Sequence, residues 1–269
     1  MRGGAQRMLT EMKSQIDKLK KYKPLLIRLV QRDLKVKYRR SVLGYLWSLL
    51  NPLLMMVVMS VVFSYMFRFN IPNYPIYLIT GQIMFTFFSE STNMAMGSII
   101  GNVSLIKKVY VPKYIFPISR VLSSFVTLLF SLAAVVIVML VTKTPVTPVI
   151  LLFPIPLAYV LAFSMGVGLI LSVLAVYFRD TTHLYGVLTT AWMYLTPIFY
   201  PIESIPEKVQ PLIRLNPLFQ FIDCFRQIVL YGQVPTLQNT VISFLWCLIA
   251  LAVGTWLFRK RQSNFILHI

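Results

Sequence analysis

The sequence predicts an all-α integral membrane protein with six transmembrane helices, an N-terminal amphipathic interface helix and a re-entrant helical hairpin before the last transmembrane helix. Hydrophobic residues make up 57% of the 269 residues, charged residues make up 13%, and the mean hydropathy is +0.73. A soluble domain carries roughly 25% charged residues, which it needs to cover its exterior. Lipid must therefore surround most of this chain.

Six long apolar runs define the predicted transmembrane helices. They lie near residues 42–67, 76–96, 114–142, 149–177, 184–200 and 237–258. All but the fifth contain the roughly 20 residues that a helix needs to cross the hydrocarbon core. We therefore divide the chain into a flexible basic N-terminus (1–23), an amphipathic helix (24–41), a transmembrane domain (42–258) and a C-terminal segment (259–269).

The basic residues predict the orientation in the membrane. The net charge is +18, and 13 of the 26 Lys and Arg residues lie between Arg2 and Arg40. Further basic residues fall in the 97–113 and 178–183 connections and after residue 258, all on the same predicted side. Because positive loops stay in the cytoplasm, both termini are expected there. Aromatics lie inside the apolar runs rather than among the basic residues, so nucleic acid is not an expected partner.

The basic segment after Pro24 has the pattern of an amphipathic helix. Leu26, Val30, Leu34 and Tyr38 recur every four residues. The basic side chains on another face are those of Arg28, Arg32, Lys35 and Arg39. Such a helix suits the surface of an anionic leaflet or the headgroup of a lipid diphosphate. The alternative is an orienting charge cluster that only holds anionic lipid.

Residues 217–230 predict a second amphipathic helix, on the opposite side of the membrane. The apolar face consists of Leu218, Phe221, Ile222, Phe225, Ile228 and Val229, opposite Gln220, Asp223, Arg226 and Gln227. With 14 residues and two charges, the segment is too short and too polar to span. We expect it to dip into the outer leaflet or, equally, to lie outside the membrane as a plain amphipathic helix.

Few residues suit catalysis. The eight acidic residues and two histidines are scattered, and no Gly-Lys pair occurs, which excludes a Walker A phosphate loop. Glu90 lies within a predicted transmembrane helix, at the depth of Ser48 and Asn51. An intramembrane carboxylate normally has a polar partner or faces a wet cavity. Glu90 and Asn51 are therefore either a structural hydrogen-bonding pair between helices or part of a polar patch on a transport path.

Five segments resemble the membrane subunits of type-2 ABC exporters, and most closely the permeases that export O-antigen, capsule or teichoic acid. They are RRSVLGYLWSLLNPLL (39–54), LIKKVYVPKYIFPISRVLSS (105–124), VYFRD (176–180), LTPIFYP (195–201) and LNPLFQFIDCFRQIVLYG (215–232). The resemblance covers the chain after residue 24, with the segments in the order that the family has.

The resemblance implies a permease homodimer in the bacterial cytoplasmic membrane, bound by two copies of a cytoplasmic ABC ATPase subunit. ATP and Mg²⁺ would be held by that partner, with no cofactor in this chain, and the cargo would be a polyprenyl-diphosphate-linked polysaccharide. The implied ATPase contacts are Asn102, Val103, Leu105, Ile106, Lys107 and Lys108 in one loop, with Arg179 and Asp180 in another. The implied glycan path includes Phe63, Phe67, Phe88 and Tyr200.

Two other functions are compatible with parts of the sequence. A membrane-bound enzyme of lipid-linked glycan assembly would need carboxylates or histidines gathered at one depth, and no such group is visible. An ABC exporter of the same fold that moves a small drug or a lipid is opposed only by the closer resemblance to polysaccharide permeases.

Overall fold

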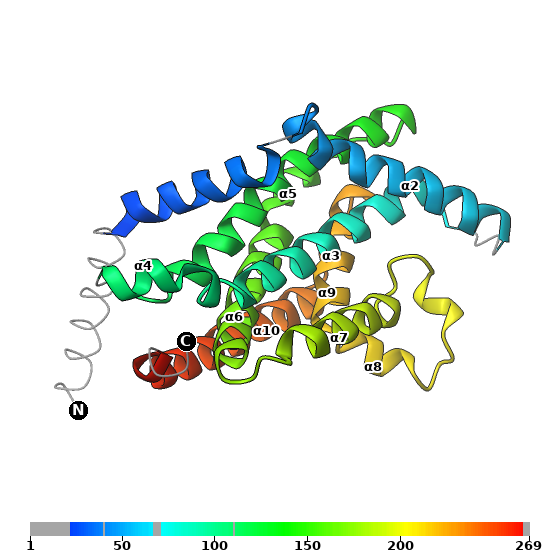
Figure 1. Cartoon of the computed structure of the whole chain (residues 1–269). Coiled ribbons are helices and arrows are strands. Elements are labelled where there is room, and N and C mark those ends of the chain that lie inside the picture. The colour runs from blue at the N-terminus through cyan, green and yellow to red at the C-terminus, as the bar shows by residue number, and fades with distance from the viewer. Residues whose placement is uncertain (1–21, 40, 67–70, 110, 266–269) are drawn as a thin grey trace.

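The computed structural model describes residues 22–39, 41–66, 71–109 and 111–265, and every element within these ranges is helical (Figure 1). A helix occupies residues 22–38, where the sequence predicts the amphipathic helix. The other helices are α2 (Trp47–Met66), α3 (Tyr74–Met96), α4 (Val103–Lys108), α5 (Ile115–Val141), α6 (Pro154–Tyr177), α7 (Thr181–Leu195), α8 (Gln210–Arg214), α9 (Pro217–Val229) and α10 (Leu237–Arg261). Short 3-10 turns join several of them, among them Gly44–Leu46 and Ile100–Asn102.

Four segments are long and apolar enough to cross a membrane, which makes the chain a multi-pass membrane protein. They are Gly44–Phe63, Ile115–Val141, Pro148–Tyr177 and Leu237–Asn264. Helix α3 has 23 residues but carries Gln82, Glu90 and Asn93, which lower its hydropathy. Helix α7 has 15 residues and spans about 22 Å at ~1.5 Å per residue, less than a hydrocarbon core of about 30 Å.

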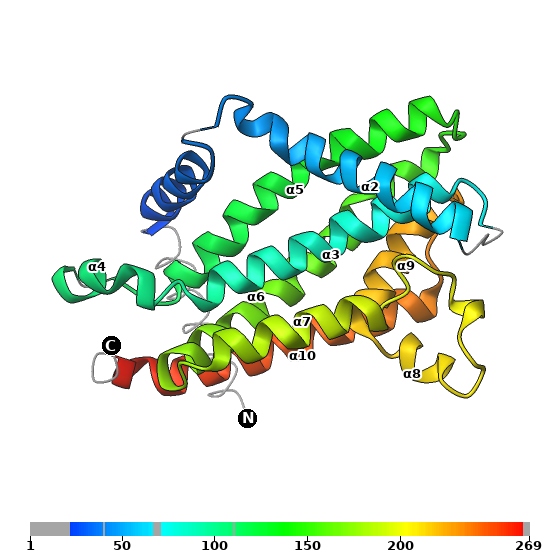
Figure 2. The same cartoon turned by 45° about the vertical axis from the view of Figure 1, so that its right-hand side comes forward.

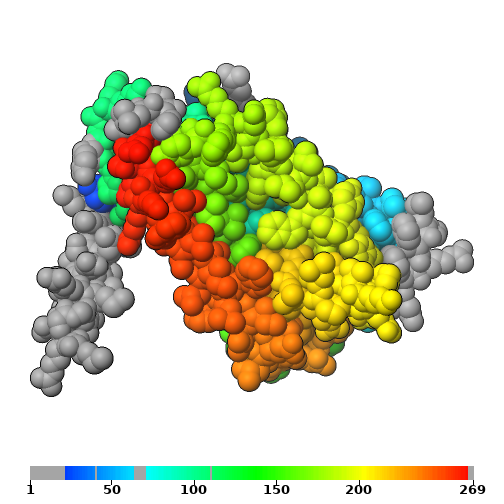
Figure 3. All heavy atoms as spheres, turned by 90° about the horizontal axis from the view of Figure 1, so that it is seen from below, coloured from blue at the N-terminus to red at the C-terminus, as the bar shows by residue number. Residues whose placement is uncertain are grey.

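Helix α3 forms the centre of the bundle. It contacts α2, α5, α6, α7 and α9, and most of its side chains are buried (Figure 2). Helix α2 packs on one side of it with an outer face left exposed, while α7 lies on another side. The view in Figure 3 shows α7 and α10 together forming one surface of the molecule. Of its polar residues, Gln82 and Glu90 are partly buried against neighbouring helices, while Asn93 is exposed.

Helices α6 and α10 approach each other at two glycines. A Cβ atom on Gly166 would lie 2.4 Å from the backbone oxygen of Ala250, and one on Gly254 would lie 2.4 Å from the oxygen of Gly166. Any side chain at either position would force the backbones apart. Small residues allow this close packing in membranes, where lipid offers no hydrophobic force to join helices.

Helix α9 has the polar face that the sequence predicts opposite the apolar one, and this polar face is buried or half-buried inside the protein. Gln220 is 3% exposed and Arg226 is 2% exposed. The guanidinium of Arg226 stacks on the ring of Tyr77, with its central carbon 3.4 Å from the ring centroid. It donates hydrogen bonds to the backbone oxygens of Tyr77 (3.0 and 3.2 Å), Pro197 (2.8 Å) and Ile198 (3.1 Å).

These bonds explain why a charged residue is buried. Helix α7 ends at Leu195, so the carbonyls of Pro197 and Ile198 lack the intrahelical donors that a continuing helix would supply. Inside a membrane protein such carbonyls must find a donor within the protein. Arg226 supplies it, and Gly81 leaves room, since a Cβ there would lie 2.7 Å from an Arg226 terminal nitrogen.

We expect Arg226→Leu to lower the free energy of unfolding by about 2–4 kcal/mol, because the carbonyls lose their donors. Unfolding of the purified protein in mixed micelles of increasing dodecyl sulfate content measures this. Arg214→Leu is the matched control, since Arg214 is exposed on α8, and it should change stability by less than about 0.5 kcal/mol. Equal stability of the two variants would contradict the proposed role of Arg226.

Candidate functional site

The elements that carry the basic residues lie together at one end of the bundle. Figures 1 and 2 place helix 22–38, α4, the turn between α6 and α7 and the end of α10 at that end. Residues 196–236, with α8 and α9, lie at the other end. The exposed basic side chains at the first end include Lys107, Lys108, Arg179, Arg259, Lys260 and Arg261.

An apolar cluster holds this end together. It contains Leu29 of helix 22–38, Ile99 after the end of α3, and Ile115 and Phe116 at the start of α5. The remaining members are Leu169, Val173 and Val176 of α6, and Phe258 and Phe265 around the end of α10. Leu105 and Ile106 of α4 pack against it with part of their surface exposed. Helix α4 therefore has an apolar side anchored in the bundle and a basic side, with Lys107 and Lys108, that projects outward.

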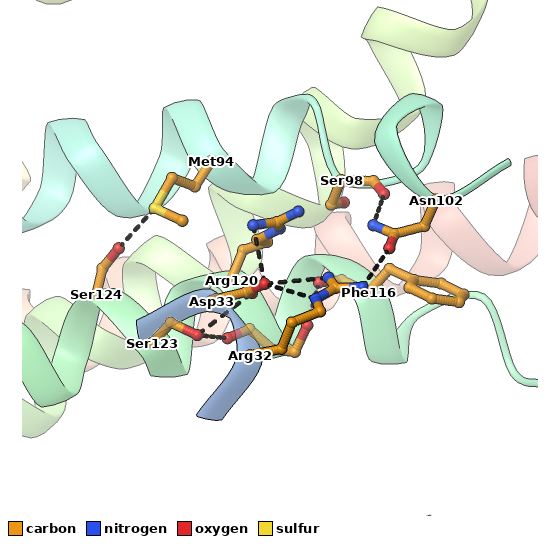
Figure 4. A network of polar contacts seen from close by, with 10 residues as sticks. Arg32, Asp33, Met94, Ser98, Asn102, Phe116, Arg120, Ser123 and Ser124 are labelled. Carbon is orange, nitrogen blue, oxygen red and sulfur yellow. Dashed lines mark hydrogen bonds and ion pairs between the residues drawn. The ribbon is translucent and has the colours of Figure 1, made fainter. Parts of the chain in front are cut away.

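A buried carboxylate, that of Asp33, connects helix 22–38 to α5 at this end (Figure 4). Its side chain is 2% exposed, and its Oδ1 accepts bonds from Arg32 of the same helix (3.0 and 3.1 Å) and forms an ion pair with Arg120 of α5 (3.1 Å). The hydroxyl of Ser123 donates to Oδ2 at 3.4 Å. One carboxylate thus meets two guanidinium groups.

Arg32 extends the network to the loop before α4. Its terminal nitrogen donates to Oδ1 of Asn102 at 3.1 Å, and Nδ2 of Asn102 donates to the backbone oxygen of Ser98 at 2.7 Å. Asn102 is 5% exposed, and its side chain faces helix 22–38, while its role as an ATPase contact stays a prediction. Val103, Leu105, Ile106, Lys107 and Lys108 follow it in α4. Helix 22–38, α4 and α5 are therefore joined through adjacent polar contacts.

Sequence reasoning missed Asp33 and Arg120. Asp33 is the one acidic residue between positions 22 and 39, and it follows Leu29 by four residues on the buried side of the helix. Arg120 lies inside the apolar run 114–142. A charge within an apolar run calls for a partner of opposite sign, so these two residues were the detectable signal.

The other predicted cytoplasmic residues lie at the surface. Arg28, Lys35 and Arg39 are exposed and border a shallow groove with Gln31 and Val36. Arg32 also borders it, although its guanidinium turns inward and its side chain is 42% exposed. In the turn between α6 and α7, Arg179 and Asp180 are both exposed. Their roles as lipid or ATPase contacts stay predictions.

Glu90 pairs with Lys37 of helix 22–38, with both side chains about one-third exposed. The hydroxyl of Ser48 instead donates to the backbone oxygen of Tyr45 at 2.6 Å. Ser48 and Asn51 nevertheless line the same cavity as Glu90. The two helices predicted to meet at this depth thus do so around a cavity, with Lys37 as the partner of the carboxylate.

The aromatic residues assigned to the glycan path are placed differently from one another. Phe88 is 0% exposed and packs near Phe163 (ring centroids 5.7 Å apart) and Trp192 (5.2 Å), so in this conformation it belongs to the core. Phe63 stacks on Phe199 at 5.5 Å. Tyr200 donates to the backbone oxygen of Tyr194 at 2.5 Å. Phe67 lies outside the described residues, and a glycan role for all four stays a prediction.

Within the described ranges, no three His, Cys, Asp or Glu residues gather as metal ligands would. The chemistry that the site offers is charge pairing, hydrogen bonding and basic surface.

The Asp33 network predicts a measurable coupling energy. Asp33→Asn should cost about 3 kcal/mol of stability, because it leaves two cations facing each other without their counter-ion. Combined with Arg120→Gln, the double variant should lose about 1–3 kcal/mol less than the sum of the single losses. Unfolding in mixed micelles of the four proteins of the cycle measures this. Asp180→Asn, at an exposed position, is the control, and additive losses would show that the pair is not coupled.

Comparison with known proteins identifies the family. Residues 24–230 match the ABC-2 type transporter family. The O-antigen export system permease protein RfbA of Klebsiella pneumoniae is 34% identical over 244 residues, which cover 90% of this chain and 93% of that protein. RfbA of Myxococcus xanthus is 30% identical, covering 93% and 97%. The polysialic acid transport protein KpsM of Escherichia coli is 24% identical, covering 87% and 92%. The family resemblance found in the sequence is thereby confirmed, and the chain belongs to the ABC-2 type transporter family.

Proposed function

We propose that this chain is the permease subunit of an ATP-driven exporter that moves a polyprenyl-diphosphate-linked polysaccharide across the bacterial cytoplasmic membrane. The observation that carries the proposal is the grouping of α4, the turn between α6 and α7 and helix 22–38 at one end of an ABC-2 bundle. Relatives that match nearly the whole chain are named as O-antigen and polysialic acid export proteins. Long similarity to several such permeases favours a polysaccharide over a small drug or a lipid.

Energy would come from a separate ATPase subunit that holds ATP and Mg²⁺. The sequence has no Walker A loop, and α4 offers an exposed, basic side supported by an apolar anchor. A helix fixed in this way can transmit a displacement by a docked partner to α5 and helix 22–38. Arg179 and Asp180 would make the second contact.

Two copies of the permease would form the transport path between them. The most exposed apolar side chains of α2 and α7 are a surface that a second copy could cover, and they include Leu54, Val57, Val58 and Val61 of α2 and Leu184, Val187 and Leu188 of α7. Helix α7 is also the one that is too short to span alone. A second copy packed against α2 and α7 would cover the region where one protomer has a helix too short to span.

In this arrangement α2, α3, α5, α6, α7 and α10 are the six crossings, with both termini in the cytoplasm. Helices α8 and α9 form the re-entrant hairpin on the outer side. The burial of α9 and the carbonyl bonds of Arg226 support a hairpin that enters the protein, since a surface helix would leave one face open.

The exposed basic face of helix 22–38 would bind the diphosphate of the lipid carrier. Arg28, Lys35 and Arg39 lie near one another along a groove on the side away from the bundle. Each basic residue near an anionic surface contributes about 1 kcal/mol. The same face would also attract ordinary anionic lipid, so the two ligands must be compared directly.

The ATPase contact is tested by charge reversal on α4. We expect Lys108→Glu with Val109→Asp to abolish co-purification of the ATPase subunit and to lower export at least about tenfold, by unfavourable charge at the contact. The matched control is the same pair of changes in the dipeptide Lys208-Val209, which is exposed at the opposite end of the molecule. Surface polysaccharide in cells lacking the native permease, and ATP hydrolysis by the purified complex, are the measurements. ATP hydrolysis by the purified chain alone would contradict the proposed function.

The diphosphate site is tested by the combined changes Arg28→Gln, Lys35→Gln and Arg39→Gln. Loss of about 3 kcal/mol of electrostatic attraction should lower the polyprenyl diphosphate that co-purifies with the complex by at least tenfold. Mass spectrometry compares this lipid with phosphatidylglycerol in the same sample. An equal fall in both lipids would mean that the face only holds anionic lipid.

A further inference from the structure

A cavity of about 310 Å³ with a mixed polar and apolar lining lies between helix 22–38, α2, α3 and α5. It is lined by Lys37 and Tyr38 of the first helix, Trp47, Ser48, Asn51 and Pro52 of α2, Gln82, Ile83, Thr86, Phe87 and Glu90 of α3, and Ser124, Thr127, Leu128 and Ser131 of α5. Gln82 lies about 20 Å along α3 from the helix end at Met96, at ~1.5 Å per residue. The cavity therefore reaches from the cytoplasmic end deep into the bundle.

Polar residues line this cavity in stripes from three membrane helices. Gln82, Thr86 and Glu90 are spaced four residues apart and so share one face of α3. Ser124, Thr127 and Ser131 form the corresponding stripe on α5, and Ser48 and Asn51 lie on α2. Polar groups inside a membrane are costly, so their convergence on one cavity indicates that something polar occupies it.

The cavity lining carries no net charge. Its single cation, Lys37, pairs with its single carboxylate, Glu90. A phosphate or diphosphate would need surplus cations, such as those on the outer face of helix 22–38, and none is left here. The lining instead offers hydroxyl and amide groups, which suit an uncharged ligand with many hydroxyls.

Several of these polar groups have unused hydrogen-bond donors or acceptors. The Oε1 atom of Gln82 is buried, with no hydrogen-bond partner among the described residues. Asn51 and Thr86 line the cavity and are exposed, and their side chains bond to no described residue. By contrast, Ser131 is already used, since it donates to the backbone oxygen of Ser48 at 2.8 Å. The unused donors and acceptors thus lie on α2 and α3.

Two aromatic residues also line the site. Trp47 is 44% exposed, and Tyr38 is half-buried, with its ring 4.8 Å from that of Tyr45. Aromatic faces pack well against the apolar C–H face of a sugar ring, while hydroxyls and amides bond to its edge. The volume is at the small end of the ~300–1,000 Å³ typical of ligand sites, which fits one or two rings but not a long chain.

We infer that this cavity binds one neutral sugar residue of the transported glycolipid, with Gln82, Thr86 and Asn51 bonding its hydroxyls and Trp47 against its face. The inference rests on the proposed function and deepens it. It gives the permease a contact with the glycan separate from the basic groove, which would hold the diphosphate.

Photocrosslinking tests the occupant in cells that make the polysaccharide, with the full chain and its ATPase partner. Benzoylphenylalanine at Thr127, inside the cavity, should capture glycan detectable with a polysaccharide-specific antibody. At Leu129, which is 47% exposed outside the cavity, we expect at least about tenfold less. Glycan at position 129 and not at 127, or only phospholipid or no adduct at both, would overturn the inference.

A second variant separates binding from folding. Gln82→Leu removes an unpartnered polar atom, so stability should be unchanged or higher, whereas export should fall about tenfold through the lost ligand bond. Ser164→Ala is the matched control, because Ser164 is also buried with an unpartnered hydroxyl but lies on α6, away from the cavity. Full export by stable Gln82→Leu would overturn the inference.

The same cells distinguish this inference from the proposed function. If the unaltered chain fails to restore surface polysaccharide in cells lacking the permease, the proposed function is wrong. If it restores export while position 127 captures no more glycan than position 129, the cavity inference alone is wrong.

Discussion

The carboxylate of Asp33 is the constraint on which the basic end of the bundle, with helix 22–38, α4 and the start of α5, depends. It lies between two guanidinium groups, from Arg32 and Arg120, and is almost fully buried. A buried charge of this kind is tolerated only while its partners stay in place, because desolvation is repaid only by well-made contacts. Helix 22–38 therefore cannot shift against α5 without breaking an ion pair. Since Arg32 also bonds Asn102, the loop that leads into α4 is held by the same residues. Helix 22–38 and the stretch from Asn102 to α5, which lie far apart in the sequence, are thus held together by adjoining contacts.

The end that carries α8 and α9 is held by a different kind of contact. Arg226 has no carboxylate among its bonded partners and instead donates to backbone oxygens of Tyr77, Pro197 and Ile198. Backbone carbonyls beyond a helix end must be satisfied, so this contact supplies donors where α7 stops. The basic end, in contrast, uses charge pairs between side chains, which can exchange partners. The contacts around α9 are therefore the more rigid ones, and those around Asp33 can rearrange more easily.

The periodicity of apolar residues predicts most of the helices, because lipid imposes a length and a hydropathy on each. The runs near 114–142, 149–177 and 237–258 correspond to α5, α6 and α10. Periodicity does not predict the partners of charged residues, since it gives the face of a helix on which a residue lies and not the residue that another element places against it. Asp33 and Arg120 are 87 positions apart, and two of the carbonyls that Arg226 bonds belong to Pro197 and Ile198, which bear no polar side chain. For the same reason the sequence predicts the polar face of α9 but not that this face is buried or half-buried.

Asp33 and Lys37 are four residues apart, so they lie on the same side of helix 22–38. One is fixed to α5 and, through Arg32, to the loop before α4, while the other pairs with Glu90 beside the cavity. A rigid helix carries any displacement of its first fixed point to the second, about 6 Å further along its axis at ~1.5 Å per residue. A partner that moved α4 would therefore act on the Lys37–Glu90 pair without touching it. The geometry thus links the loop before α4 to the cavity through a single turn of helix 22–38.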